Sequence, residues 1–198
     1  MLTACLACTT PLPARAQQPD LTGLDDGMVG PRTRMLVLGS VHLREQKDFR
    51  AEALAPLLDK LAAFGPEVIT IEAIGGEQCD LAARHPAVYG EDYCQGTDKA
   101  RAATGLDIPA ALAGVNKALA AWPANPTPAQ RRHLAALFLA ASDPASAYVQ
   151  WLRLPAGERR VGEGLDEALV QALRELETRN NESFQIGARL AATLGLER

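Results

Sequence analysis

The chain has 198 residues, a length that suits one domain with a substantial buried core. Its formal net charge is −4, and no run of Lys and Arg interleaved with aromatic residues occurs, which argues against nucleic acid as a partner. No apolar run of membrane-spanning length follows the N-terminus, so no transmembrane helix is predicted.

The N-terminal segment 1–16 is small and apolar, which predicts a processed leader. Ala14 and Ala16 give it the small-x-small form of a signal-peptidase site, with cleavage after Ala16. The residues up to Cys5 also resemble a lipobox, in which Cys5 carries a lipid and attaches the protein to a membrane. Both interpretations place the protein in the periplasm or cell envelope of a bacterium. A disordered leader without a targeting role is the alternative. Residues 17–33, rich in Pro, Gly and Asp, predict a linker.

Two short apolar runs, 35–38 and 68–71, predict buried strands, and the segment 48–64 between them predicts a helix. A strand, a helix and a strand form a right-handed crossover, so the two strands are expected to be parallel. The sequence therefore predicts an α/β (α+β) fold. Its small, partly parallel sheet begins with a βαβ unit and is flanked by several helices.

Polar residues end both predicted strands. Gly39 turns the chain after the first strand and His42 follows, whereas Glu72 comes directly after the second strand. Neighbouring strands lie about 4.8 Å apart, so the imidazole and the carboxylate are expected to meet at the sheet edge where ligands bind. Histidine and glutamate together bind a divalent metal, or act as a base and the group that orients it. The alternative is a structural histidine at a strand end.

Outside the leader the chain contains Cys79 and Cys94, which flank a polar, turn-rich stretch. An oxidising compartment would join such a pair. Metal binding is the alternative, although the spacing lacks the close cysteine pairs of a zinc site. A disulfide is favoured, and it would constrain the loop that follows Glu72.

The second half of the chain is predicted to be helical. Thr127, Pro128 and Gln130 form a strong helix start, with an N-cap, a proline at the first helical position and a capping box. Tyr148 and Trp151 are interpreted as core residues, and a wall of the substrate site is the alternative. The other helices are predicted at 109–121, after Asp143, around 165–176 and around 186–194.

Arg179 and Asn180 lie at the join between the last two predicted helices. In a functional interpretation, Arg179 reaches the site and stabilises negative charge, or pairs with Glu72. In the other interpretation, an asparagine caps the last helix and Arg179 is a solvated charge at a helix end.

The order of these motifs resembles the TraB/GumN/Tiki superfamily, with its ChaN-like and erythromycin-esterase-like relatives. That group has G-x-x-H after the first strand, a glutamate after the next strand, and an Arg-Asn or Arg-Asp element on a late helix. The resemblance covers 34–198, and the family's second histidine motif has no counterpart in it, as in a C-terminally incomplete member. The matching residues are Gly39, His42, Glu72, Arg179 and Asn180.

Tiki-like members resemble metal-dependent peptidases, and erythromycin-esterase-like members hydrolyse esters. The resemblance therefore implies a metal-dependent hydrolase of the cell envelope that acts on a peptide or a small-molecule substrate. His42, Glu72 and Arg179 would be its catalytic residues, and His42 and Glu72 would bind Mn, Co, Zn or Fe. ChaN-like members resemble haem-binding lipoproteins, so the alternatives are an envelope lipoprotein that binds haem or another small ligand, and an inactive scaffold.

Overall fold

The computed structural model describes residues 22–23, 27, 29–90, 94 and 96–198. The predicted cleavage site after Ala16, the lipidation of Cys5 and part of the linker 17–33 lie outside these residues. The chain divides into two units, Met1–Gly39 and Ser40–Arg198, which are described separately.

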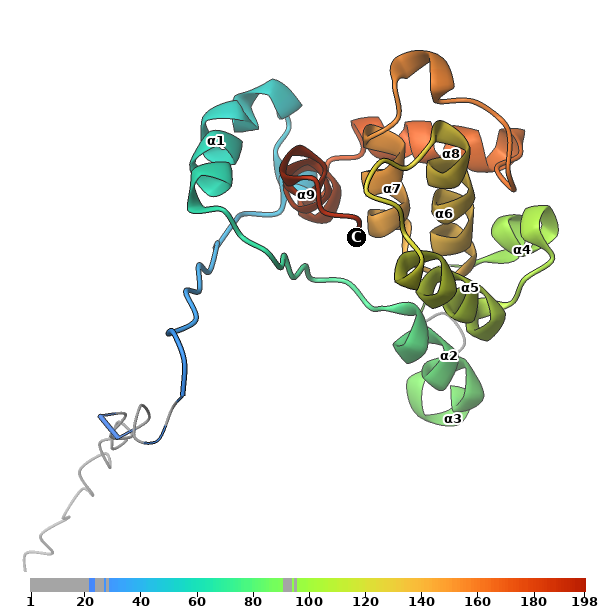
Figure 1. Ribbon diagram of the computed structural model, residues 1–198, viewed down its shortest axis with the longest axis horizontal. Coiled ribbons are helices and arrows are strands. Elements are labelled where there is room, and N and C mark those ends of the chain that lie inside the picture. Colours follow the sequence, from blue (N-terminus) through green and yellow to red (C-terminus); the bar gives the residue numbers. More distant parts are fainter. Residues whose placement is uncertain (1–21, 24–26, 28, 91–93, 95) are drawn as a thin grey trace, which may run out of the picture. The chain divides into compact units, whose positions relative to one another are not determined.

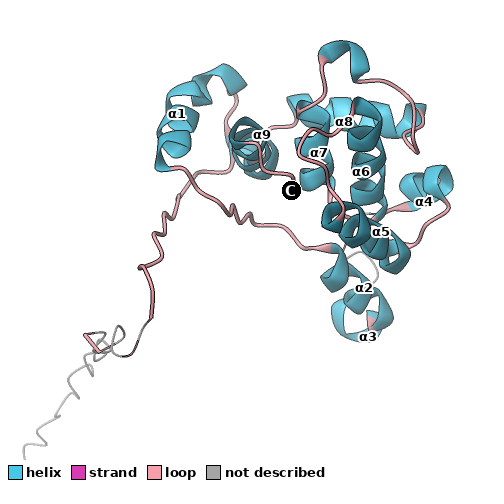
Figure 2. Ribbon diagram, viewed as in Figure 1, coloured by secondary structure: helices cyan, strands magenta, loops and turns pink. Residues whose placement is uncertain are grey.

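In the first unit, residues 29–39 form neither helix nor strand (Figure 2). Met35 and Val37 are 82% and 85% exposed. The predicted strand 35–38 is therefore wrong. A run of four apolar residues has no periodicity that separates a strand from an irregular segment, and a strand is stable only when partners pair with it.

The second unit opens with two short 3₁₀-helices, η1 (Leu43–Glu45) and η2 (Ala51–Leu54), followed by the α-helix α1 (Ala55–Phe64). Gly65 ends α1 in the left-handed conformation, with φ of 66°, which glycine adopts without a steric penalty. The predicted helix 48–64 is thus confirmed at its C-terminal end and begins a few residues later than expected.

Residues 66–75 then run without helix or strand between α1 and the next helix (Figure 1). Ile69 and Ile71 pack against the core, whereas Val68 is 78% exposed. The methyl carbon Cγ2 of Ile71 lies against Gly187, where it would be only 2.7 Å from an added Cβ. The apolar residues of 68–71 therefore belong to an extended segment that packs one side against the core and pairs with no strand among the described residues.

The predicted α/β fold with a parallel sheet is wrong. Among the described residues, the single β contact is an isolated antiparallel bridge between Gly162 and Leu165. The second predicted strand, 68–71, buries its isoleucines against helices, so its apolar face is covered without any strand pairing.

The rest of the second unit is helical (Figure 1). Several of its helices begin with the caps that the sequence predicts. The Thr127 hydroxyl accepts from the backbone N–H of Gln130 at 3.2 Å, and the Asp143 carboxylate accepts from the backbone N–H of Ser146 at 3.0 Å. The predicted helix starts at these positions are confirmed. The elements are α2 (Gly76–Arg84), α3 (Pro86–Tyr89), α4 (Asp98–Thr104), α5 (Ile108–Ala120), α6 (Pro128–Ala140), α7 (Pro144–Leu152), η3 (Ala156–Glu158), α8 (Glu167–Thr178), the π-helix η4 (Ser183–Ala188) and α9 (Arg189–Leu194).

The core of this unit lies around α6 and α7. Helix α6 contacts α4, α5 and α7, and α7 also contacts α8, η4 and α9. Tyr148 and Trp151 of α7 are fully buried, so their interpretation as core residues is confirmed. An added Cβ at Gly114 would lie 3.0 Å from the Leu137 side chain, which shows how closely α5 approaches α6.

Two buried arginines of α6 hold later segments against the core. Arg131 donates to Gln150 at 2.8 Å and to the Glu197 carboxylate at 2.9 Å. Arg132 bonds the carboxylates of Glu158 and Glu163, which fixes the loop between α7 and α8. No helix of the described residues combines the length and the apolar character that crossing a membrane requires.

Candidate functional site at His42 and Glu182

His42 lies at the start of the second unit, where it is the N-cap of η1. The next residue, Leu43, is only 6% exposed and anchors this turn in the protein. The His42 side chain itself is 54% exposed. The chain therefore fixes the backbone beside His42 while its imidazole remains accessible from solvent.

The partner of His42 is Glu182, at the N-cap of η4. One carboxylate oxygen, Oε1, lies 3.4 Å from Nδ1 of His42 and accepts a hydrogen bond of 2.8 Å from the Leu43 backbone N–H. The backbone bond is short and fixes the carboxylate, whereas the contact with the imidazole is at ion-pair distance. The same glutamate thus holds both the backbone of η1 and the histidine that precedes it.

The environment of Glu182 keeps its carboxylate ionised. Partial burial would raise its pKa, but hydrogen bonds from its own N–H and from the Leu43 N–H oppose this effect, as does the nearby His42. The net result is that the pKa of Glu182 lies below its ordinary value. An ionised carboxylate is therefore available beside His42 at neutral pH.

This arrangement selects one tautomer of His42. A carboxylate beside Nδ1 favours the proton on that nitrogen, which leaves Nε2 with a free lone pair. An imidazole held in this way is suited to accept a proton from water or from a hydroxyl group. The pair therefore has the composition of a general base and its orienting carboxylate.

Glu72, the expected partner of His42, does not interact with it. Its side chain is exposed, and it makes no hydrogen bond or ion pair with any described residue. The expected meeting point was a shared sheet edge, and residues 66–75 form no strand. The structure therefore does not bring His42 and Glu72 together at a sheet edge.

Arg179 and Asn180 are both exposed and lie between α8 and η4. The Arg179 guanidinium lies 5.7 Å from the centre of the Phe184 ring, a cation–π contact. The Asn181 side chain accepts from the Ser183 N–H at 2.9 Å, as a capping residue does. Asn181, directly before the N-cap residue Glu182, thus bonds the first turn of η4, while Arg179 remains exposed two residues earlier in the chain.

The donor set around His42 is small for a metal centre. Within the described part of the chain, no three side chains of His, Cys, Asp or Glu lie close enough to hold one ion. Catalytic zinc sites use three protein ligands. The other two histidines, His85 and His133, are exposed and lie on other elements. Gly39, which the motif includes, has open space around it, since an added Cβ there would meet no atom within 4 Å.

No protein-family model, curated protein or solved structure matches this chain. The resemblance to the TraB/GumN/Tiki superfamily therefore stays a prediction that depends on the order of short motifs.

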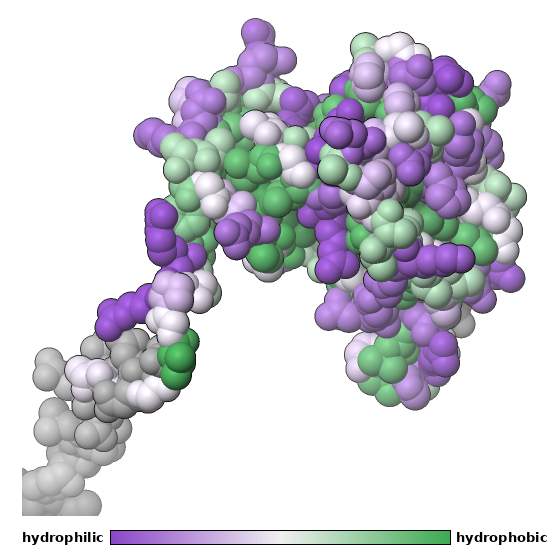
Figure 3. Space-filling model, in the orientation of Figure 1, coloured by the Kyte–Doolittle hydropathy of each residue, from purple (hydrophilic) through white to green (hydrophobic). Residues whose placement is uncertain are grey.

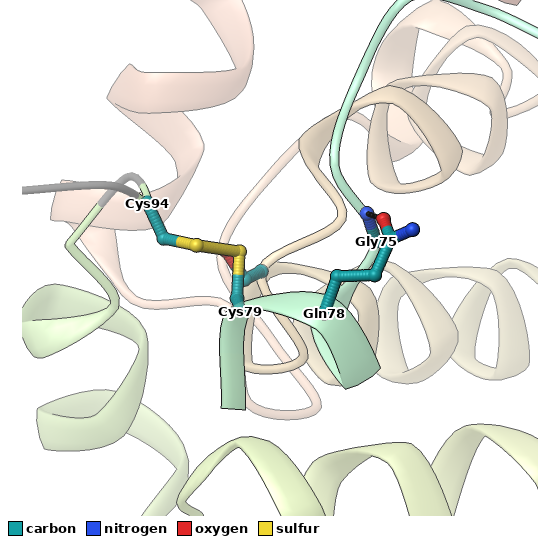
Figure 4. The surroundings of a disulfide bond; sticks show 5 residues. Gly75, Gln78, Cys79 and Cys94 are labelled. Atoms are coloured by element: carbon teal, nitrogen blue, oxygen red, sulfur yellow. Dashed lines mark hydrogen bonds between the residues drawn. A yellow bond between two sulfur atoms is a disulfide. The ribbon is translucent and has the colours of Figure 1, made fainter. Parts of the chain in front are cut away.

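Cys79 and Cys94 lie at disulfide-bonding distance, with 2.18 Å between the sulfurs and 5.6 Å between the Cα atoms (Figure 4). Cys79 is buried in the first turns of α2. The start of this helix is capped, because the Gly75 N–H donates to the Gln78 side chain at 3.1 Å. The cross-link therefore acts on α2, the helix into which residues 66–75 lead.

A cavity of about 360 Å³ lies along residues 67–75. Its other walls come from the start of α7, with Asp143 and Ser146, and from η4 and α9, with Gly187 and Ala191. The lining is mainly apolar, and its polar side chains are those of Glu67, Asp143, Ser146 and Arg198. The π-helix η4 thus contributes both to this cavity and, through Glu182 at its N-cap, to the candidate site.

Glu182 is the site residue that the sequence did not predict. It belongs to the same polar join as Arg179 and Asn180, so the motif pointed to the correct segment. However, Glu182 is separated by 139 positions from Leu43, to which it bonds. An acidic residue before an apolar helix is otherwise typical of a favourable helix start, so the sequence offers no signal that singles it out.

Proposed function

We propose that this chain is a hydrolase of the cell envelope, peptidase- or esterase-like, in which His42 is the general base. The observation that carries the proposal is the single Glu182 oxygen shared between His42 Nδ1 and the Leu43 N–H. It supports a fixed, ionised carboxylate beside an accessible imidazole, the arrangement that general-base hydrolysis uses.

In the proposed reaction, Nε2 of His42 removes a proton from a water molecule as that water attacks the carbonyl carbon of the substrate. The proton then passes from His42 to the leaving oxygen or nitrogen when the carbonyl–heteroatom bond breaks. Glu182 stays ionised throughout and stabilises the imidazolium that forms. The exposed guanidinium of Arg179, close to Glu182 in the chain, is the proposed cation for the negative charge on the carbonyl oxygen. The described residues around His42 do not supply three metal ligands, so in this proposal His42 activates the water directly.

The test is hydrolysis of 4-nitrophenyl acetate and of fluorescein-labelled casein by the wild type and two histidine variants. His42→Ala is expected to lower kcat/KM by about 100-fold or more, since it removes the general base. His133→Ala is the matched control, because His133 is exposed on α6 and lies outside the site. Equal loss in both variants would reveal non-specific ester cleavage by surface histidines, and wild-type turnover in His42→Ala would refute the proposal.

A second candidate function, the binding of a small ligand, is favoured by the cavity along residues 67–75. No His, Cys, Met or Tyr lines this cavity, so its described lining does not fit haem, whose iron needs such a ligand. Its volume of about 360 Å³ falls within the range of about 300–1,000 Å³ found for ligand pockets. Titration with the fluorescent apolar dye 8-anilinonaphthalene-1-sulfonate is expected to shift the emission of the dye in the wild type and to shift it less in Val68→Trp, which narrows the rim of the cavity. An identical shift in both proteins would argue against binding in this cavity.

A further inference from the structure

A second cleft, of about 340 Å³, lies where α1, the end of α7 and α9 meet, and it shares no lining residue with the cavity along residues 67–75. Figure 3 shows apolar surface gathered near α1 and α9. The cleft combines two arginines with an apolar wall. Its lining residues are Leu58, Leu152, Arg153, Arg189, Ala192 and Thr193.

Arg189 is the unusual residue of this cleft, because it is half-buried and pairs with no carboxylate among the described residues. Its Nη2 lies 3.5 Å from the Glu177 carbonyl oxygen, a weak contact at the limit of hydrogen bonding. Its Nε is buried and has no hydrogen-bond partner in the described part of the chain. Partial burial of a guanidinium without a counter-ion costs free energy, which an anion bound to its accessible nitrogens would offset.

The side chains near Arg189 do not pair with its guanidinium as a carboxylate would. The Glu177 carboxylate, which also acts on Tyr148, accepts instead from Trp151 at 2.8 Å and lies 3.7 Å from Arg159. The neighbouring Tyr148 hydroxyl is buried and also has no partner in the described structure. Burial raises the pKa of this hydroxyl, and the positive charge of Arg189 opposes the rise. A phenol kept neutral at physiological pH supplies no negative charge to Arg189.

Arg153 adds a second, rigidly held positive charge. Its Nη1 donates to the carbonyl oxygens of Gly195 and Leu196, at 2.7 and 3.0 Å, and pairs with Glu197 at 2.7 Å. Burial and then the nearby Arg131 lower the pKa of Arg153, and Glu197 only partly opposes them. The single Glu197 carboxylate is therefore shared between two arginines, Arg131 and Arg153.

We infer that this cleft binds a small organic anion, a carboxylate or phosphate group carried on a short apolar tail. Arg189 and Arg153 hold the oxyanion, because a guanidinium presents paired donors that match both groups. The tail lies against Leu58 and Leu152. The inference is independent of the hydrolase proposal, since no residue of the His42–Glu182 site lines this cleft.

The experiment is calorimetric titration of the full chain at low salt with octanoate and with octyl phosphate, which distinguish the two anions. Acetate, inorganic phosphate and octanol serve as the head-only and tail-only probes. We expect octanoate, octyl phosphate or both to bind at least about tenfold more tightly than any of these three, because head and tail both contribute. If neither amphiphile binds, or if octanol binds equally well, the inference is wrong.

Arg189→Gln is expected to weaken binding by about tenfold or more, since it removes a charge-assisted contact. Arg174→Gln is the matched control, because it makes the same charge change at an exposed position of α8. Thr193→Trp fills the cleft from an exposed position and leaves both arginines in place, so it tests the site if Arg189→Gln proves unstable. Unchanged affinity in a folded Arg189→Gln or Thr193→Trp protein would overturn the inference, as would equal weakening in Arg174→Gln.

Discussion

Two glutamates of the second unit, Glu197 and Glu182, have lowered pKa values but very different surroundings. Glu197 accepts from Arg131, Gln150 and Arg153, so several donors from α6 and α7 converge on one carboxylate. Glu182 accepts from the backbone N–H groups of Leu43 and of its own residue, and it faces a histidine that is 54% exposed.

The difference separates a charge that holds the structure together from a charge available for chemistry. The donors that bond Glu197 include buried side chains, so removal of the Glu197 carboxylate would leave buried polar groups without a partner. Beside Glu182 the imidazole keeps one nitrogen directed away from the carboxylate, and little of the core depends on the pair. Changes at the first glutamate should therefore affect stability, and changes at the second should affect turnover.

The largest effect is expected for Arg131→Ala. This side chain is 8% exposed, bonds Gln150 and Glu197, and lies 6.0 Å from the centre of the Trp122 ring. Its removal leaves buried polar groups without their partner, which costs about 3 kcal/mol of unfolding free energy. Urea denaturation followed by circular dichroism measures the change. The exposed Arg174→Ala should stay within about 0.5 kcal/mol of wild type, and equal losses in both variants would refute the distinction between the two regions.

The second unit also shows which features of a chain are predictable from sequence. The starts of α6 and α7 were predictable because their caps, such as Thr127 with Gln130, join residues within a single turn. The pairing of Cys79 with Cys94 is similar in kind, since cysteine chemistry leaves few alternatives. Each of these signals is local or specific to one residue type.

The strands and the partner of His42 depend instead on contacts between distant segments. The apolar side chains of Ile69 and Ile71 pack against helices. The apolar pattern in the sequence does not show whether a helix or a strand covers them. The contact of His42 with Glu182 joins the first turn of the second unit to its last helical stretch. The motif at Arg179 and Asn180 predicted the segment that contacts His42. The residue in that segment that makes the contact, Glu182, is evident only from the packed structure.

An intermediate effect is expected from acid. The pKa of Glu197 is lower in the folded protein than its ordinary value of 4.5, despite the burial that opposes this, because Gln150 and Arg131 bond its carboxylate and Arg153 adds a further positive charge. The unfolded chain therefore binds more protons, so stability rises with pH and is lost as the pH falls below about 4.5 toward the folded pKa. Thermal melting of the wild type between pH 3 and 7 should show this loss, and Glu197→Gln should make the melting temperature less dependent on pH. An equally steep dependence in the variant would place the acid-sensitive group elsewhere.

The smallest effect on stability is expected for Glu182→Gln, at about 1 kcal/mol or less, because the pair with His42 is largely solvated. The amide keeps the shape of the side chain and leaves an oxygen for the Leu43 N–H, but it removes the negative charge beside the imidazole. Turnover of 4-nitrophenyl acetate should therefore fall about tenfold or more, since the imidazolium loses its stabilising carboxylate. Unfolding measurements and kinetics on the same preparation compare both effects directly. A variant that loses stability as Arg131→Ala does, or that keeps wild-type turnover, would show that Glu182 fixes η1 to η4 and does not activate His42.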